Sequence, residues 1–258
     1  MISPIHKLDA RVKFLLALGF IITCSLTPIA RWPVYLLLFA IVLSVEILSS
    51  LGLGYIHRRA ALAFPFALAA FPVIFTNEGR WLFSLPIGHW SFVASIEGLD
   101  RFVSILLKSW LSVQAAIVLA ACTPFPELLQ AMRAVRIPRL LVAMFGLMWR
   151  YLFVLVDEAL RLIRARAARS GHLVKDAGVG PGGSLPWRAR VAGGMAGNLL
   201  LRAFERSERI YVAMLSRGYD GETRSLPLPP VTAQSRLILV SGVLLLASLI
   251  LVGLFLRH

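Results

Sequence analysis

Five long apolar runs dominate the hydrophobic pattern of the chain, and short polar or proline-rich segments separate them. A helix needs about 20 apolar residues to cross the hydrocarbon core of a bilayer, which is roughly 30 Å thick. We therefore expect each run to form a membrane-spanning helix, with the third run kinked by Pro65 and Pro72. In chain order, the runs are Phe14–Leu26, Val34–Leu51, Ala60–Phe75, Phe102–Ala121 and Leu237–Phe255.

Residues 78–98 interrupt the helical pattern between the third and fourth runs. Tryptophan, proline and glycine here punctuate short segments of alternating polarity, which is typical of strands and turns. Tryptophan also favours the boundary between membrane and water. This segment is therefore predicted to form an extracytoplasmic hairpin.

A different pattern, amphipathic and helical, fills residues 122–230. One long helix is expected from Arg139 to Gly171, and the sequence GVGPGGSLP separates it from a second one. Apolar residues recur at three- and four-residue steps in both helices, which predicts a buried stripe on each. The stripes are Leu152, Val156, Ala159 or Leu160, Ile163 and Ala167 in the first helix, and Leu199, Ala203, Ile210 and Met214 in the second.

Composition and charge set the class of protein and its orientation. The chain is 58% hydrophobic with a mean hydropathy of +0.78, which indicates a multi-pass protein of a cell membrane. The formal net charge of +14 gathers before the first run, after the second and after the fourth, so these segments are predicted to be cytoplasmic. We expect an all-α protein with spans 1–4 in residues 1–121, a cytoplasmic domain in residues 122–230 and a last span in residues 231–258.

The two amphipathic helices end alike, in an arginine between small residues. The first ending is Ala168-Arg169-Ser170 and the second is Ser216-Arg217-Gly218. Arginine in a last turn offsets the helix dipole, and the glycines that follow suit left-handed caps, so each ending alone could be a simple helix stop. Their repetition favours a second interpretation, in which small neighbours let a partner close around each guanidinium group.

Two ionisable residues, Glu46 and Lys108, fall within predicted spans. Each either lies near a boundary and packs into the bundle, or marks an internal polar contact or partner face. No catalytic cluster is visible, no phosphate-binding glycine loop with lysine occurs, and the five histidines are not at ligand spacing on one helix. We therefore expect no metal site, no cofactor and no nucleic-acid binding in this chain.

These segments resemble a known family, the transmembrane T component of energy-coupling factor (ECF) transporters. The resemblance rests on the opening HKLDARVKFLLA, on TPFPELLQAMRAVRIPRLL and on the two segments that end at Arg169 and Arg217. The Ala-Arg-Gly-type signatures of the family fall on Ala168-Arg169-Ser170 and Ser216-Arg217-Gly218. The second signature is most similar to that of the cobalt/nickel branch.

The resemblance implies a role and a set of partners. The chain would couple two cytoplasmic ATP-binding-cassette ATPases, which hold ATP and Mg²⁺, to an integral-membrane substrate-binding subunit, which holds the cargo. Cobalt(2+) is the first choice of cargo, nickel and biotin or another vitamin are alternatives, and a further small membrane subunit stays open. A stand-alone permease, a membrane scaffold and a membrane-embedded enzyme are the alternatives from other classes.

Overall fold

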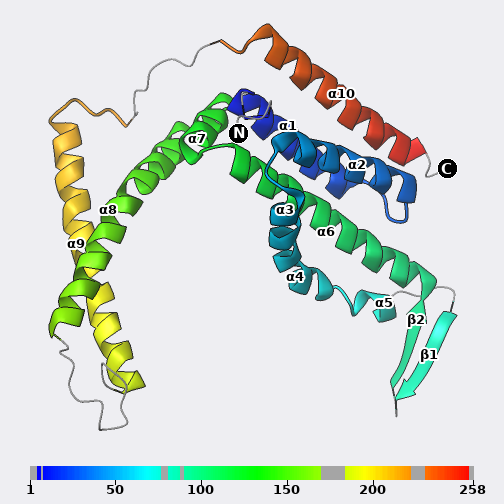
Figure 1. Cartoon of the computed structure of the whole chain (residues 1–258), viewed down its shortest axis with the longest axis horizontal. Helices are drawn as coiled ribbons and strands as arrows, with labels where there is room; N and C mark the ends of the chain where they lie inside the picture. Colours follow the sequence, from blue (N-terminus) through cyan, green and yellow to red (C-terminus); the bar gives the residue numbers. More distant parts are fainter. Residues whose placement is uncertain are drawn as a thin grey trace. The chain divides into compact units, whose positions relative to one another are not determined.

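The computed structural model describes residues 5–6, 8–76, 81–87, 90–169, 184–221 and 230–255. Its helices are α1 (Ala10–Leu26), α2 (Trp32–Ser49), α3 (Leu53–Ala60), the 3-10 turn Ala61–Ala63, α4 (Phe64–Leu68), α5 (Val73–Thr76), α6 (Ile96–Cys122), α7 (Phe125–Ala134), α8 (Arg139–Arg169), α9 (Leu185–Leu215) and α10 (Ala233–Phe255). Two strands, β1 (Trp81–Ile87) and β2 (Trp90–Ser95), precede α6 (Figure 1). The chain divides into two compact units, Met1–Val135 with Leu228–His258, and Arg136–Pro227.

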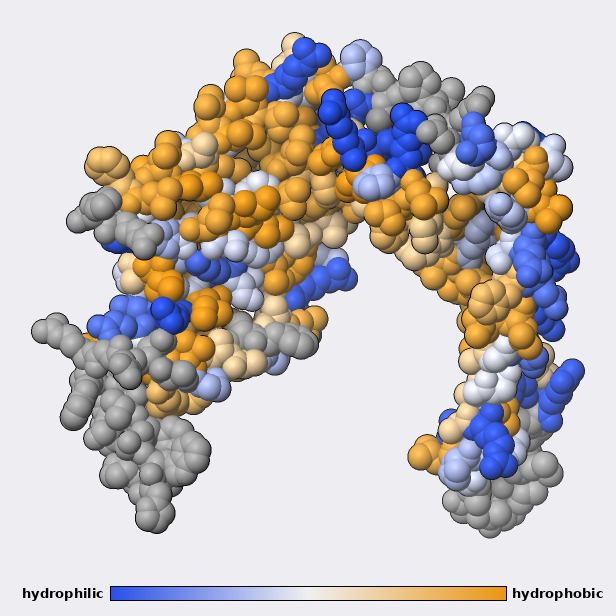
Figure 2. Space-filling model, turned by 180° about the vertical axis from the view of Figure 1, so that it is seen from behind, coloured by the Kyte–Doolittle hydropathy of each residue, from blue (hydrophilic) through white to orange (hydrophobic). Residues whose placement is uncertain are grey.

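The first unit is a helical bundle built on α1, α2, α6 and α10. Its core is a cluster of buried apolar side chains from all four helices, among them Phe20, Leu38, Leu111 and Leu246. Large apolar side chains also cover much of its outside, and Figure 2 shows hydrophobic surface over large parts of this unit, interrupted by hydrophilic patches. A bundle that is apolar both inside and outside is a bundle that faces lipid.

Four described helices, α2, α6, α8 and α10, are long and apolar enough to cross a membrane by length and composition. Three of them coincide with predicted spans. The helix α1 has 17 residues and is therefore about 26 Å long, slightly short of the hydrocarbon thickness. The helix α8 lies in the segment predicted to be cytoplasmic, and it differs from the other three in the four arginines of its C-terminal third.

The predicted third span is wrong as a single helix. Between Ala60 and Phe75 the structure contains the end of α3, a 3-10 turn, the short helix α4 and the short helix α5. Pro65 and Pro72 lie in this stretch. Proline lacks a backbone donor and its ring clashes with the preceding turn, so two prolines seven residues apart divide the segment instead of bending it.

The two strands β1 and β2 pair antiparallel where the sequence predicts a hairpin. Their register brings Ile87 opposite Trp90 and Leu85 opposite Phe92. The hairpin leads directly into α6, whose first turn is capped by Ser95: its Oγ accepts a hydrogen bond of 3.0 Å from the backbone N–H of Gly98.

The close approach of α5 to α6 at Gly98 gives a testable effect on stability. A Cβ atom at Gly98 would lie 2.5 Å from the carbonyl oxygen of Ile74 and 3.0 Å from its Cα. Backbone atoms cannot turn aside as a side chain can, so we expect Gly98→Ala to lower the free energy of unfolding by about 1–3 kcal/mol. Thermal unfolding of the purified protein measures this.

The matched control is Gly193→Ala in α9, where nothing lies within 4 Å of the added Cβ. Alanine favours a helix over glycine by about 0.5–1 kcal/mol, so this variant should be slightly more stable than the original chain. Equal stability of the two alanine variants would contradict the close packing of α5 against α6.

Candidate functional site

The helices α8 and α9 form an antiparallel pair in the second unit. The carboxylate of Glu158 in α8 accepts from the guanidinium group of Arg202 in α9. About two turns further along α8, the Arg166 guanidinium lies 5.8 Å from the ring centroid of Trp187, near the start of α9. The C-terminal end of α8 therefore lies beside the N-terminal end of α9, and Figure 1 shows the two helices crossing.

The stripe predicted on α9 is confirmed. Its members Leu199, Ala203, Ile210 and Met214 are half-buried, whereas their neighbours on the helix are exposed. This face of α9 is the one that is shielded in the isolated chain.

The stripe predicted on α8 is wrong except at Ala159. The structure leaves Leu152, Val156, Leu160, Ile163 and Ala167 exposed, with Ile163 showing 54% of its surface. The half-buried positions lie on a neighbouring face and include Glu158 and Arg166, the residues that contact α9. A single partner helix covers only one side of α8, and that side also includes Tyr151, Leu155 and Leu162. Leu152, Val156, Leu160 and Ile163 therefore form an exposed apolar face on the described part of α8.

The first arginine ending lies at the C-terminus of α8. Arg169 is the last residue of the helix, and both it and Ala168 are exposed. Ser170 and Gly171 lie outside the described residues, so the predicted cap at Gly171 stays a prediction. Arg169 extends the guanidinium group from the end of α8 that lies beside the start of α9.

The second arginine ending follows α9, and its geometry is fully described. The N–H of Tyr219 donates to the carbonyl of Met214 at 3.0 Å, and the N–H of Gly218 donates to that of Leu215 at 2.9 Å. This bond pair is a Schellman cap, and the φ angle of +79° at Gly218 is the left-handed conformation that the cap requires. The cap predicted at Gly218 is confirmed. Ser216 and Arg217 are exposed in this turn, with the Ser216 hydroxyl donating to the carbonyl of Ala213.

The two arginine endings lie at opposite ends of the helix pair. Arg169 lies at the end marked by Trp187, and 30 residues of helix and cap separate Trp187 from Arg217. At 1.5 Å per residue, the two endings are about 45 Å apart. This distance is too large for both arginines to bind in one pocket.

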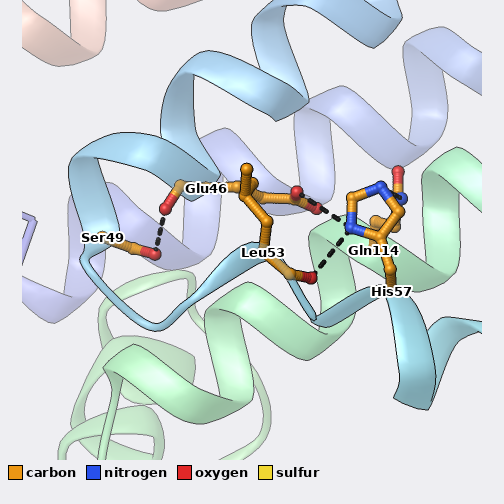
Figure 3. A network of polar contacts seen from close by, with 5 residues as sticks. All are labelled: Glu46, Ser49, Leu53, His57 and Gln114. Carbon is orange, nitrogen blue, oxygen red and sulfur yellow. Dashed lines mark hydrogen bonds and ion pairs between the residues drawn. The ribbon is translucent and has the colours of Figure 1, made fainter. Parts of the chain in front are cut away.

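Glu46 belongs to a polar cluster inside the first unit (Figure 3). Its side chain is 1% exposed, and its Oε2 lies 3.6 Å from Nδ1 of His57 in α3. The same Nδ1 lies 3.0 Å from the carbonyl of Leu53, which can only accept, so Nδ1 carries a proton. Nε2 of His57 lies 3.4 Å from the side-chain nitrogen of Gln114 in α6. The cluster thereby joins α2, α3 and α6.

The Glu46 carboxylate has no hydrogen-bond donor among the described residues, although both of its oxygens are buried. An ionised carboxylate is costly to bury without a nearby cation or donor. His57 is the group in position to supply the charge. No role for His57 or Gln114 was predicted from the sequence, although Gln114 stands out as a polar residue inside an apolar run.

Lys108 makes an internal contact as one of two reciprocal lysines between the antiparallel helices α1 and α6. Its Nζ donates to the carbonyl of Ser25 in the last turn of α1, at 3.0 Å. Near the start of α1, Lys13 donates to the carbonyl of Cys122, the last residue of α6, at 3.1 Å. Helix C-termini carry carbonyls without a partner in the helix and a negative partial charge. Each lysine therefore donates to such a carbonyl at the end of the neighbouring helix. Lys13 belongs to the basic segment before the first run, from which the sequence predicts only the orientation of the chain.

Within the part of the chain that the structure describes, no three histidine, cysteine or acidic side chains lie together as a metal site would require. Cys24 and Cys122 are buried free thiols. The site residues that stand out are therefore the exposed arginine endings and the internal polar cluster.

Spanning helices, a lipid-facing bundle and a separate helix pair with arginine endings define a polytopic, almost entirely helical membrane protein. The profile of the family described as cobalt transport protein, CbiQ, matches residues 1–227, and the chain belongs to this family. The T-component family inferred from the sequence is thereby confirmed.

Curated relatives match over most of the chain. It is 28% identical to the cobalt transport protein CbiQ of Rhodobacter capsulatus, over 95% of this chain and 91% of that protein. It is 28% identical to the energy-coupling factor transporter transmembrane protein EcfT of Lactococcus lactis, over 96% and 93%. A putative fused cobalt transport protein, CbiMQ, of Methanocorpusculum labreanum is 24% identical over 85% of this chain, which spans only 35% of that longer protein.

Proposed function

We propose that this chain is the transmembrane coupling subunit of an ATP-driven uptake transporter for cobalt(2+). In this proposal the chain lies in the inner membrane, with its N-terminus in the cytoplasm. It links two cytoplasmic ATP-binding-cassette ATPases to an integral-membrane substrate-binding subunit. The observation that carries this proposal is the pair of exposed arginine endings at opposite ends of α8 and α9. A separation of about 45 Å suits two separate ATPase subunits, each receiving one arginine.

Each arginine ending has the chemistry of an anchor. A guanidinium group offers five donors in a planar fork, which a groove lined by carboxylates or backbone carbonyls can satisfy. Ala168 and Ser216 are small, so the wall of the groove can approach closely. The Schellman cap fixes the backbone at Arg217, which lowers the entropy lost on binding.

The apolar face of α8 supports a second partner. Leu152, Val156, Leu160 and Ile163 are exposed along nearly three turns of a helix whose opposite side holds charged residues. Such a face favours contact with a membrane-embedded protein. The fused relative named CbiMQ, in which the part matched by this chain is joined to a further segment, supports a partner of this kind.

Cobalt as the cargo is supported by the family description and by the names of the Rhodobacter and Methanocorpusculum relatives. The subunit itself is non-catalytic in this proposal: ATP and Mg²⁺ bind to the ATPases, and the cation binds to the substrate-binding subunit. Nickel, biotin or another vitamin is the cargo in the alternative version of the same role.

The test is uptake by cells that carry the whole transporter, compared with cells that lack this chain. We expect loss of the chain to abolish ATP-dependent accumulation of radioactive cobalt, and to leave biotin uptake unchanged. Nickel accumulation is measured at the same concentration, and the comparison shows which of the two cations the transporter prefers. Cobalt accumulation that continues without the chain would contradict the proposal, and accumulation that needs the chain but no ATPase would indicate a stand-alone permease.

A further inference from the structure

A partly enclosed apolar cavity of about 380 Å³ lies inside the first unit, between α1, α2, α6 and α10. It lies at the end of the bundle where α1 and α10 begin and where α2 and α6 end. Its walls include Phe20, Val42, Ala115 and Leu245, and Ile5 from the N-terminal segment also lines it. The proposed transport function does not use this cavity.

The cavity has one cation at its end. Lys13 lines it, is only 9% exposed, and donates one hydrogen bond to the carbonyl of Cys122. An ammonium group carries three donors, so two remain. No carboxylate of the described chain forms an ion pair with Lys13, and a buried cation without an anion is unfavourable. An anion bound beside Lys13 would supply both the charge and the missing acceptors.

The apolar walls and their surroundings indicate a lipid chain. Three of the four walls, α2, α6 and α10, are helices long and apolar enough to span a bilayer, so hydrocarbon surrounds the unit. The volume is within the range of small-molecule sites.

We propose that this cavity binds one acyl chain of an anionic phospholipid, with the lipid phosphate beside the ammonium group of Lys13. The start of α1 is the end predicted to face the cytoplasm, and the cytoplasmic leaflet is the one that carries anionic lipids. The position of Lys13 thus agrees with the side from which such a lipid would enter.

The test measures lipid binding to the full-length chain, purified with whatever subunits accompany it, by native mass spectrometry. The probes are phosphatidylglycerol and phosphatidylcholine with identical acyl chains. The cavity-filling variant is Ala115→Phe, and its matched control is Ala116→Phe, at the next residue of α6, which is exposed and does not line the cavity. Lys13→Gln removes the charge but keeps a donor for the Cys122 carbonyl.

We expect the original chain and Ala116→Phe to bind phosphatidylglycerol about tenfold more tightly than phosphatidylcholine. Ala115→Phe should weaken phosphatidylglycerol binding about tenfold, which corresponds to losing about two buried methylene groups. Lys13→Gln should bind the two lipids equally. If Ala115→Phe does not fold, as judged by thermal unfolding, Ala17→Leu fills the same cavity from α1.

Three results would overturn the proposal. The first is equal phosphatidylglycerol binding by Ala115→Phe and Ala116→Phe, which would place the lipid elsewhere. The second is equal affinity of the original chain for the two lipids. The third is cross-linking of a photoreactive residue at Leu245 to a partner polypeptide instead of to lipid, which would show that a protein fills the cavity.

Discussion

Replacing both Arg169 and Arg217 by alanine is expected to abolish cobalt uptake while leaving insertion into the membrane intact. Both side chains are exposed in the isolated chain and lie at helix ends, so their removal disturbs no packing. In the complex, each guanidinium group would be desolvated against its groove. Truncation of such a charged anchor costs about 2–5 kcal/mol of binding, and every 1.4 kcal/mol is a tenfold change in affinity. Two lost anchors should therefore release the ATPases.

The control is a chain that loses two arginines elsewhere on the same helices. Arg164 in α8 and Arg209 in α9 are also exposed but do not lie at helix ends. The variant with Arg164→Ala and Arg209→Ala has the same net charge as the first variant. Any difference between the two variants therefore comes from the position of the lost arginines and not from the lost charge. Uptake of radioactive cobalt is measured for both, with membrane content checked by immunoblot. Undiminished uptake by the variant that lacks Arg169 and Arg217 would refute their role.

Removing His57 is expected to destabilise the first unit by about 1–3 kcal/mol, because Glu46 is buried but the His57 side chain is 34% exposed. In the His57→Ala variant, the Glu46 carboxylate would stay buried with neither a counter-charge nor a donor. Adding Glu46→Gln should recover much of that loss, because the second change removes the uncompensated charge. The double-mutant cycle is measured by thermal unfolding of the purified protein.

The matched comparison is the exposed ion pair between Glu158 and Arg202, in which the arginine side chain is 59% exposed. Pairs of this kind contribute about 0–1 kcal/mol, so Glu158→Gln should change stability little. If His57→Ala is no less stable than Glu158→Gln, or if Glu46→Gln adds to its loss, then Glu46 and His57 do not act as a pair.

The apolar runs that carry no proline were the parts of the fold most predictable from the sequence. The runs Val34–Leu51 and Leu237–Phe255 correspond to α2 (Trp32–Ser49) and α10 (Ala233–Phe255). A long apolar run has few alternatives in a membrane, because its backbone must satisfy its own hydrogen bonds. The run at Ala60–Phe75 is as apolar, but its two prolines remove donors, and hydropathy does not contain that information.

The candidate site was predictable where it depends on local sequence and not where it depends on tertiary contacts. The cap at Gly218 follows from the residues of one turn. The apolar arc of α8 is wider than one helix can cover, so its period alone could not show which side meets α9. Likewise, Glu46 and His57 meet because the chain reverses at Ser50–Gly52, where both end residues have positive φ angles.

The most direct test of the central claim is photo-cross-linking from the residues that precede the two arginines. A photoreactive amino acid is placed at Ala168 or at Ser216, and a third chain carries it at Leu244, an exposed residue of α10. After illumination of membranes that contain the whole transporter, the cross-linked proteins are identified by mass spectrometry. We predict that Ala168 and Ser216 each cross-link to an ATP-binding-cassette ATPase and that Leu244 does not. Absence of the ATPase from the cross-links of both Ala168 and Ser216 would contradict the proposal that the arginine endings bind it.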